Sequence, residues 1–138
     1  MKKVRHFVSR YPFSLLCVAL VWYLSIWFRP PEELPLPSFD FMDKWTHFVM
    51  YGGTCSVIWL EYLHSHSRLD GAKLFLWAWL APALMGGVIE LVQAYCTATR
   101  SGEWLDFGAD AFGCTLAVGV GLACRRWLPW ARPKKDAW

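Results

Sequence analysis

Four long apolar blocks, at residues 12–28, 45–63, 74–95 and 104–124, constrain the fold of this chain more than any other feature. A bilayer core about 30 Å thick needs roughly 20 apolar residues at about 1.5 Å of rise each, and the four blocks come close to that length. Backbone inside a membrane has to satisfy its own hydrogen bonds, so a single segment of this length can only cross as a helix. The sequence therefore predicts an all-α membrane protein, a bundle of four transmembrane helices.

The composition excludes several other classes of protein. Of the 138 residues, 56% are hydrophobic and 18% are charged, whereas a typical soluble domain has about 25% charged residues. This balance excludes a disordered chain and argues against a water-soluble enzyme domain. The five cysteines show no paired spacing, which favours buried thiols over a disulfide or metal framework. We expect one integral membrane domain over residues 1–138, with a basic tail at 125–138.

The positions of the lysines and arginines predict the orientation of the chain. Four precede the first block, two lie between the second and third blocks, and five follow the fourth. The other three, Arg29, Lys44 and Arg100, lie on the opposite side. Because lysine and arginine gather in cytoplasmic loops, we expect both termini in the cytoplasm and a location in the cytoplasmic (inner) membrane. Membrane lipids are the expected partners, and nothing in the pattern favours nucleic acid.

Ionisable residues in and beside the last three blocks are the main functional signal. A charge at membrane depth costs about 2.5–3.5 kcal/mol on insertion scales, so its presence asks for a reason. The spacing places several of these side chains on shared helical faces, i to i+4 in the second and fourth helices and i to i+3 in the third. We expect a binding site formed by Asp43, Lys44, His47, Tyr51, Glu90, Gln93, Asp106 and Asp110, with Arg100 at its rim.

The predicted depths of these residues coincide. Glu90 lies five residues before Tyr95, and Asp110 lies six residues after Trp104, which places both about 8–9 Å below the outer membrane boundary. His47 lies about 5 Å deep by the same rise. Polar residues scattered by chance would not share one shallow layer. The sequence therefore predicts that three helices converge in a polar pocket that faces outward.

The fourth helix also carries a small residue at every fourth position. Ala109, Gly113, Ala117 and Gly121 form a small-xxx-small stripe, which lets helices approach closely. Gly113 and Ala117 follow Asp110 by three and seven residues, so all three share one face. The stripe therefore directs Asp110 into the bundle rather than toward lipid.

These motifs, in this order, resemble the VanZ-like family of small bacterial membrane proteins. The resemblance covers roughly residues 36–121 and rests on Asp43-Lys-Trp-Thr-His47-Phe-Val-Met-Tyr51, Glu90-Leu-Val-Gln93, Arg100, Asp106 and Asp110-Ala-Phe-Gly113. One position departs from the family pattern, since Asp110 stands where the family usually has asparagine. The resemblance implies a protein of the bacterial cell envelope. The founding member of the family is associated with resistance to teicoplanin, a glycopeptide antibiotic with a lipid tail.

Two functions for such a pocket follow from its residues together with the resemblance. The first is to bind or shield an amphiphile in the outer leaflet, with an amphiphilic antibiotic or a lipid-linked cell-wall precursor as the candidate partner. The second is enzymatic action on an envelope lipid or on such a precursor. In an enzyme, Glu90, Asp106, Asp110 or His47 would serve as general base or as ligands of a hard divalent cation. The sequence leaves open whether the chain is an enzyme and which cofactor it uses.

A third interpretation is purely structural. The same acids and bases would then form an internal network of ion pairs that joins the helices. Taken alone, His47 is more typical of a hydrogen-bond partner than of a metal ligand, and its motif has no zinc spacing, so no metal is assigned. Glu61, near the inner end of the second helix, is expected to reach interfacial water.

Overall fold

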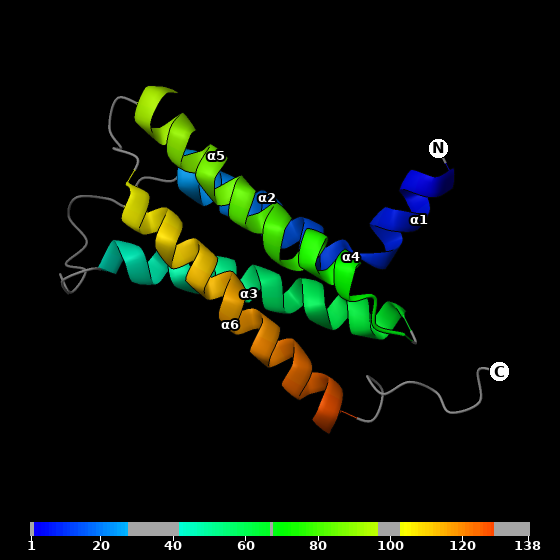
Figure 1. Ribbon diagram of the computed structural model, residues 1–138. Helices are drawn as coiled ribbons and strands as arrows, with labels where there is room; N and C mark the ends of the chain where they lie inside the picture. The colour runs from blue at the N-terminus through cyan, green and yellow to red at the C-terminus, as the bar shows by residue number, and fades with distance from the viewer. Residues whose placement is uncertain (1, 28–41, 67, 97–102, 129–138) are drawn as a thin grey trace.

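The computed structural model describes residues 2–27, 42–66, 68–96 and 103–128, and this part of the chain is helical except for short connections (Figure 1). α4, η1 and α5 follow one another without a break, so they form one long helix. The predicted all-α class is confirmed, and each predicted block contains a helix. The elements are α1 (Lys2–Arg10), α2 (Pro12–Ile26), α3 (Met42–Ser65), α4 (Gly71–Phe75), the π-helical turn η1 (Leu76–Leu80), α5 (Ala81–Cys96) and α6 (Trp104–Trp127).

Within the described part of the chain, two helices are long and apolar enough to cross a membrane: Gly71–Cys96 with 26 residues and Trp104–Trp127 with 24. At about 1.5 Å per residue they measure about 39 and 36 Å, more than the ~30 Å of a bilayer core. α1 and α2 would add a third span only if taken together, and they are bent by 86° at their junction. α2 alone has 15 residues, about 22 Å. α3 has 24 residues but is not among these apolar helices.

The amino-terminal helix α1 was not expected, since the sequence pattern treats this segment only as a basic flank. Its apolar residues Val4, Phe7 and Val8 fall at i, i+3 and i+4, so they share one face among basic neighbours. α1 ends because Pro12 occupies the first position of α2 and Tyr11 takes a non-helical conformation, with φ −131° and ψ 47°. A short amphipathic helix that turns away from a span is typical of one lying along a membrane surface.

Glu61, which was expected to reach interfacial water, is half-buried and caps the start of α2. Its carboxylate accepts hydrogen bonds from the backbone N–H groups of Phe13 and Ser14, both at 2.9 Å, and from the Ser14 hydroxyl. The first N–H groups of a helix have no partner within the helix, and they carry the positive end of its dipole. A carboxylate from α3 satisfies both needs and fixes α2 against α3.

The long helix contains one π-helical turn. The N–H of Ala81 donates to the carbonyl of Leu76, five residues back instead of four. Such a turn holds one residue more than an α-turn, which rotates the following helix by about 100° relative to the preceding one. Leu74, before the turn, belongs to a core cluster with Trp59, whereas Ile89, after it, belongs to a second cluster.

α3 and α6 pack against each other more extensively than any other pair of described helices. Gly113 on α6 lies against the backbone of Phe48 and Gly52 on α3, and Gly121 lies directly under the Trp59 ring. Between these points Cys55 and Cys114 meet, with their sulfurs 3.2 Å apart. The small-residue stripe of α6 is therefore the surface on which α3 packs, as predicted.

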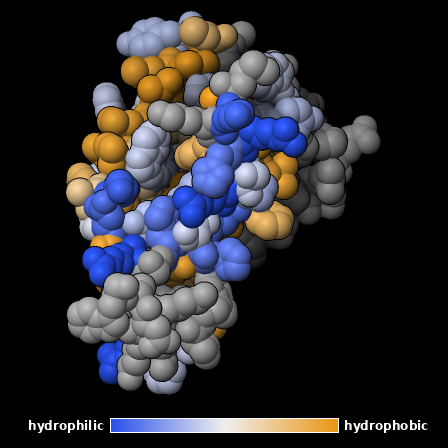
Figure 2. Space-filling model, turned by 90° about the vertical axis from the view of Figure 1, so that its right-hand side faces the viewer, coloured by the Kyte–Doolittle hydropathy of each residue, from blue (hydrophilic) through white to orange (hydrophobic). Residues whose placement is uncertain are grey.

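The two ends of the bundle differ in character. α1, the start of α4 and the end of α6 lie at one end, whereas the first turns of α3 and α6 lie at the other (Figure 1). Figure 2 faces the first of these ends, where hydrophilic residues form a band across the surface. Arg5, Arg10, Arg68 and Arg126 belong to the elements at this end and are exposed. The acidic candidates lie at the opposite end.

Gly113→Ala tests the close contact of α3 and α6. A Cβ at this position would lie 2.6 Å from the Phe48 carbonyl oxygen and 3.0 Å from the Gly52 nitrogen, so backbone would have to shift. Overpacking of this kind costs about 1–3 kcal/mol, and we expect a lower melting temperature in detergent, measured by circular dichroism. Gly119→Ala is the matched control because a Cβ there meets nothing within 4 Å. Equal melting temperatures for the two variants would contradict the packing described.

Candidate functional site

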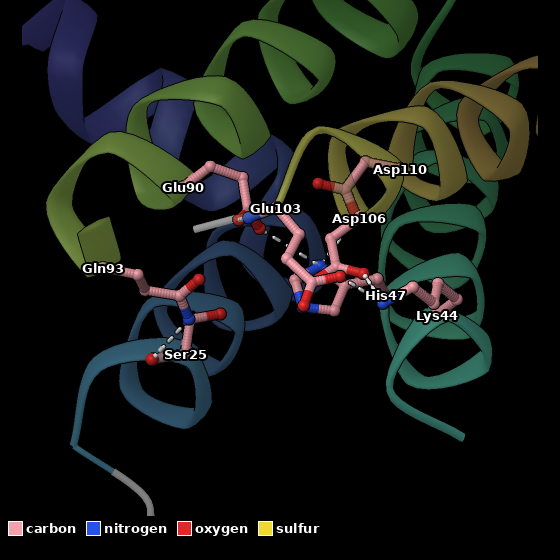
Figure 3. Close-up of polar contacts among 8 residues, drawn as sticks. All are labelled: Ser25, Lys44, His47, Glu90, Gln93, Glu103, Asp106 and Asp110. Atoms are coloured by element: carbon pink, nitrogen blue, oxygen red, sulfur yellow. Dashed lines mark hydrogen bonds and ion pairs between the residues drawn. The ribbon is translucent and has the colours of Figure 1, made fainter. Parts of the chain in front are cut away.

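Three helices bring His47, Glu90 and Asp110 together at the end of the bundle opposite α1. His47 lies in the second turn of α3, Glu90 six residues before the end of α5, and Asp110 six residues after the start of α6. Each residue is thus about 8–9 Å from the end of its helix. Nδ1 of His47 lies 3.1 Å from Oδ1 of Asp110 and 3.8 Å from Oε1 of Glu90. The three side chains turn toward one another (Figure 3).

All three side chains are buried. The exposed fraction is 5% for His47, 7% for Glu90 and 0% for Asp110. Gly86, one turn before Glu90, leaves the room that Asp110 needs, because a Cβ at Gly86 would overlap the Asp110 carboxylate. Burying an ionised group costs several kcal/mol unless partners compensate, so packing alone does not account for the cluster.

Lys44 forms a rim of ion pairs above the buried cluster. Its ammonium lies 2.6 Å from Oε2 of Glu103 and 3.1 Å from Oδ1 of Asp106. Lys44 therefore ties the first turn of α3 to the first turn of α6.

Glu103 belongs to the site although the sequence pattern did not single it out. Its backbone N–H donates to Oε2 of Glu90 at 2.8 Å, while its own carboxylate pairs with Lys44. The available signal was its place three residues before Asp106 at the start of α6, where an acid suits the helix dipole. Glu103 fixes one oxygen of Glu90 and so directs the other toward His47.

Three buried oxygens in this region have no hydrogen-bond partner within the described part of the chain. They are Oε1 of Glu90, Oδ2 of Asp110 and the hydroxyl of Tyr51. The Tyr51 ring lies parallel to the His47 ring, with 6.4 Å between centroids, and its hydroxyl lies within electrostatic reach of both carboxylates. Most buried polar atoms in proteins are hydrogen-bonded, so three unbonded oxygens in one place indicate a site that takes a further partner.

The other predicted residues are distributed differently. Gln93 is buried but donates from Nε2 to the backbone carbonyl of Ser25 at 3.0 Å, so it ties α5 to α2, away from His47 (Figure 3). Asp106 is also buried, at 3% exposed, but it pairs with Lys44 and is not one of the three residues that meet at His47. The side chain of Asp43 and the whole of Arg100 lie outside the described residues.

A groove runs between α5 and α6 beside the cluster. It has a volume of about 410 Å³, and apolar side chains make up most of its wall. Glu90 and Glu103 contribute to its polar part. The apolar walls include Leu91, Tyr95, Trp104 and Phe107. Trp104 and Tyr95 are largely exposed, so the groove opens on the outer surface of the helix pair.

The site as a whole is negative. Of the residues drawn in Figure 3, the four carboxylates Glu90, Glu103, Asp106 and Asp110 face one ammonium and one imidazole. A buried arrangement with excess negative charge attracts cations and repels a bare anionic group. A cationic group, or an anionic group that arrives with a cation, is therefore favoured in the site over a bare anion.

Glu90→Gln separates a ligand site from a purely structural network of ion pairs. The Gln amide oxygen can still accept from the Glu103 N–H, and a buried amide costs less than a buried carboxylate. We therefore expect the melting temperature in detergent to stay constant or to rise. Asp106→Asn weakens the pair with Lys44, and we expect it to lower the melting temperature by a few degrees. A comparable fall in both variants would favour the structural network.

No protein-family model, no curated protein and no solved structure matches this chain. What the site binds has to be inferred from its own chemistry. That chemistry consists of two buried acids and an imidazole from three helices, a lysine-bridged rim, and an apolar groove that begins at Glu90.

Proposed function

We propose that this chain is a VanZ-like membrane protein of the bacterial cell envelope that binds or shields an amphiphile at the outer face of the cytoplasmic membrane. In this proposal α2, α3, the helix Gly71–Cys96 and α6 all lie in the membrane, and both termini are cytoplasmic. The exposed arginines at the α1 end support this orientation, because basic residues gather on the cytoplasmic side. The cluster of His47, Glu90 and Asp110 then faces outward.

The observation that carries the proposal is the groove between α5 and α6 with Glu90 at its polar part. Ligand sites are concave, mostly apolar and lined by a few placed polar groups, and their volumes run from about 300 to 1,000 Å³. The groove of about 410 Å³ fits this description. An apolar tail would lie against Leu91 and Phe107, while its polar head would meet Glu90 and Glu103.

The resemblance to the VanZ-like family gives this ligand a candidate identity. A lipoglycopeptide of the teicoplanin type has a lipid tail for the groove and a polar body for the outer surface. Sequestering or displacing such a molecule at the outer face would lower its effect on the cell wall. The proposed biological role is therefore a contribution to resistance against lipid-tailed glycopeptides.

Gly87→Leu tests the groove directly. Gly87 lines the groove, and a Cβ there makes only ordinary contact with Phe107 at 3.4 Å, so the helix pair can accept a side chain that fills the groove. Displacing one or two buried methylene groups of a ligand costs about 0.8 kcal/mol each, so teicoplanin should bind about tenfold more weakly to the variant in nanodiscs. Expression of the variant should also give less protection against teicoplanin than the wild type.

The control for this variant is Gly119→Leu, since Gly119 is an exposed glycine of α6 with open space around it. It should bind teicoplanin like the wild type. A glycopeptide without a lipid tail should bind neither protein. Equal teicoplanin binding by Gly87→Leu and Gly119→Leu would remove the groove from the proposal.

Catalysis is the second candidate function, and the pair of His47 and Asp110 favours it. A carboxylate 3.1 Å from an imidazole nitrogen can orient the ring and stabilise its protonated form, as in a general base with an orienting acid. Glu90 adds a second carboxyl group 3.8 Å from the same nitrogen. Such an enzyme would act on the head group of a lipid held in the groove.

A lipid extract distinguishes the enzyme from the binding protein. Membranes containing the wild-type chain are incubated, and their lipids are compared by mass spectrometry with those from membranes containing Asp110→Asn. For a binding protein we expect the same lipid masses in both extracts, together with retained protection by the wild type. A new lipid species that depends on Asp110 would establish catalysis instead.

A further inference from the structure

We propose that His47, Glu90 and Asp110 bind a divalent transition-metal cation, with Zn²⁺ and Mn²⁺ as the candidates. This inference concerns the same pocket as the proposed function and rests on it for the view that the pocket receives a ligand. It goes beyond the sequence pattern, in which the three residues stand far apart and show no spacing typical of a metal motif. The donors converge only because three helices meet.

The donor atoms are close to the spacing that a metal ion imposes. One donor from each residue lies within 4.8 Å of the other two. A Zn²⁺ ion with bonds of about 2.0–2.2 Å holds neighbouring ligand atoms about 3–3.5 Å apart. Nδ1 of His47 and Oδ1 of Asp110 are already 3.1 Å apart, and Oε1 of Glu90 lies 3.8 Å from Nδ1. A small rotation of the Glu90 side chain completes the set.

The oxygens without hydrogen bonds provide an independent sign of a missing partner. Oε1 of Glu90, Oδ2 of Asp110 and the Tyr51 hydroxyl are all buried, and Tyr51 is 0% exposed. The His47 imidazole can supply at most one positive charge for the two ionised carboxylates, and the remaining negative charge is unfavourable in a buried position. A divalent cation between the two carboxylates would compensate that negative charge.

The surroundings of the cluster match those of metal ligands in other proteins. Carboxylate ligands are usually held by hydrogen bonds from a second layer of groups, which orient the remaining oxygen toward the metal. The backbone N–H of Glu103 does this for Glu90, with its 2.8 Å bond to Oε2. Gly86 acts on Asp110 through space alone: because it has no side chain, it leaves the room in which that carboxylate lies.

The donor set also limits which cation fits. One imidazole nitrogen with two carboxylates suits Zn²⁺, Mn²⁺ or Fe²⁺, whereas Mg²⁺ and Ca²⁺ prefer oxygen ligands alone. Three protein ligands leave at least one coordination position open, and Glu90 is the ligand that also lines the groove. An oxygen of a phosphate or carboxylate head group could take that position. The cation would thereby reduce the repulsion that four carboxylates exert on an anionic amphiphile.

Equilibrium dialysis tests the proposal. The purified chain in nanodiscs of zwitterionic lipid is stripped with a chelator and dialysed against Zn²⁺ or Mn²⁺, and bound metal is measured by mass spectrometry. We expect stoichiometric uptake by the wild type, and an affinity lower by about tenfold or more in Asp110→Asn and in Glu90→Gln. The matched control is Glu61→Gln, which removes a carboxylate from the opposite end of α3 and should keep the wild-type affinity.

Co²⁺ absorbance supplies a second readout that does not depend on folded variants. Bound Co²⁺ in a site of nitrogen and oxygen ligands should give d–d bands distinct from those of the aqueous ion. No stoichiometric uptake, uptake equal in the wild type and Asp110→Asn, or an aqueous Co²⁺ spectrum would each overturn the metal site.

The groove is tested separately. Failure of metal uptake with weaker teicoplanin binding by Gly87→Leu would leave the proposed function intact, whereas metal uptake with no effect of Gly87→Leu would leave only the metal site.

Discussion

The close approach of α3 and α6 is the contact on which the rest of the structure depends. Gly113 lies against the backbone of Gly52 and Phe48, with no side chain between the two helices. This contact sets how far apart all other residues of the two helices are. His47, one turn from Gly52, and Asp110, one turn from Gly113, therefore meet at 3.1 Å. The polar cluster is a consequence of the glycine contact, because longer side chains at the crossing would separate the imidazole from the carboxylate.

Acids within the helical bundle impose a second constraint, which the chain meets in two ways. Glu61 is placed at the start of α2, where two backbone N–H groups and a hydroxyl bind its carboxylate. Such an acid is fully used in holding helices together. Glu90 and Asp110 each keep one oxygen without a hydrogen bond, although they are at least as deeply buried. The contrast within one chain separates a structural carboxylate from carboxylates that are available to a ligand.

The periodic features were predictable from the sequence, whereas contacts between distant segments were not. Helix positions follow from apolar blocks, and the shared depth of His47, Glu90 and Asp110 follows from counting residues to each helix end. The direction of a polar side chain depends instead on which helix lies beside it. Gln93 shares a face with Glu90 yet bonds to Ser25 on α2, and only the packing of α2 against α5 decides this.

Local breaks in helical regularity could not be predicted from the apolar periodicity of the sequence either. α1 is too short and too polar to produce an apolar block, and its 86° turn depends on Tyr11 and Pro12 alone. Glu103 binds Glu90 through its backbone N–H, a group that every residue except proline has. The residue type at position 103 therefore gave only a weak signal of this contact. The meeting of His47, Glu90 and Asp110 near the ends of three helices could thus be predicted, whereas the contact between Glu103 and Glu90 could not.

Because a π-helical turn spans Leu76–Leu80, the direction in which Glu90 points depends on the number of residues in that turn as well as on the residue types. Removing a single residue there would restore α-helical spacing and swing the rest of the helix by about 100°, toward a different neighbour. All three side chains of the cluster would still be present, but Glu90 would no longer face His47 and Asp110. Among proteins of this kind, an insertion or deletion at that turn would therefore be a sharper sign of altered function than many substitutions within the pocket itself.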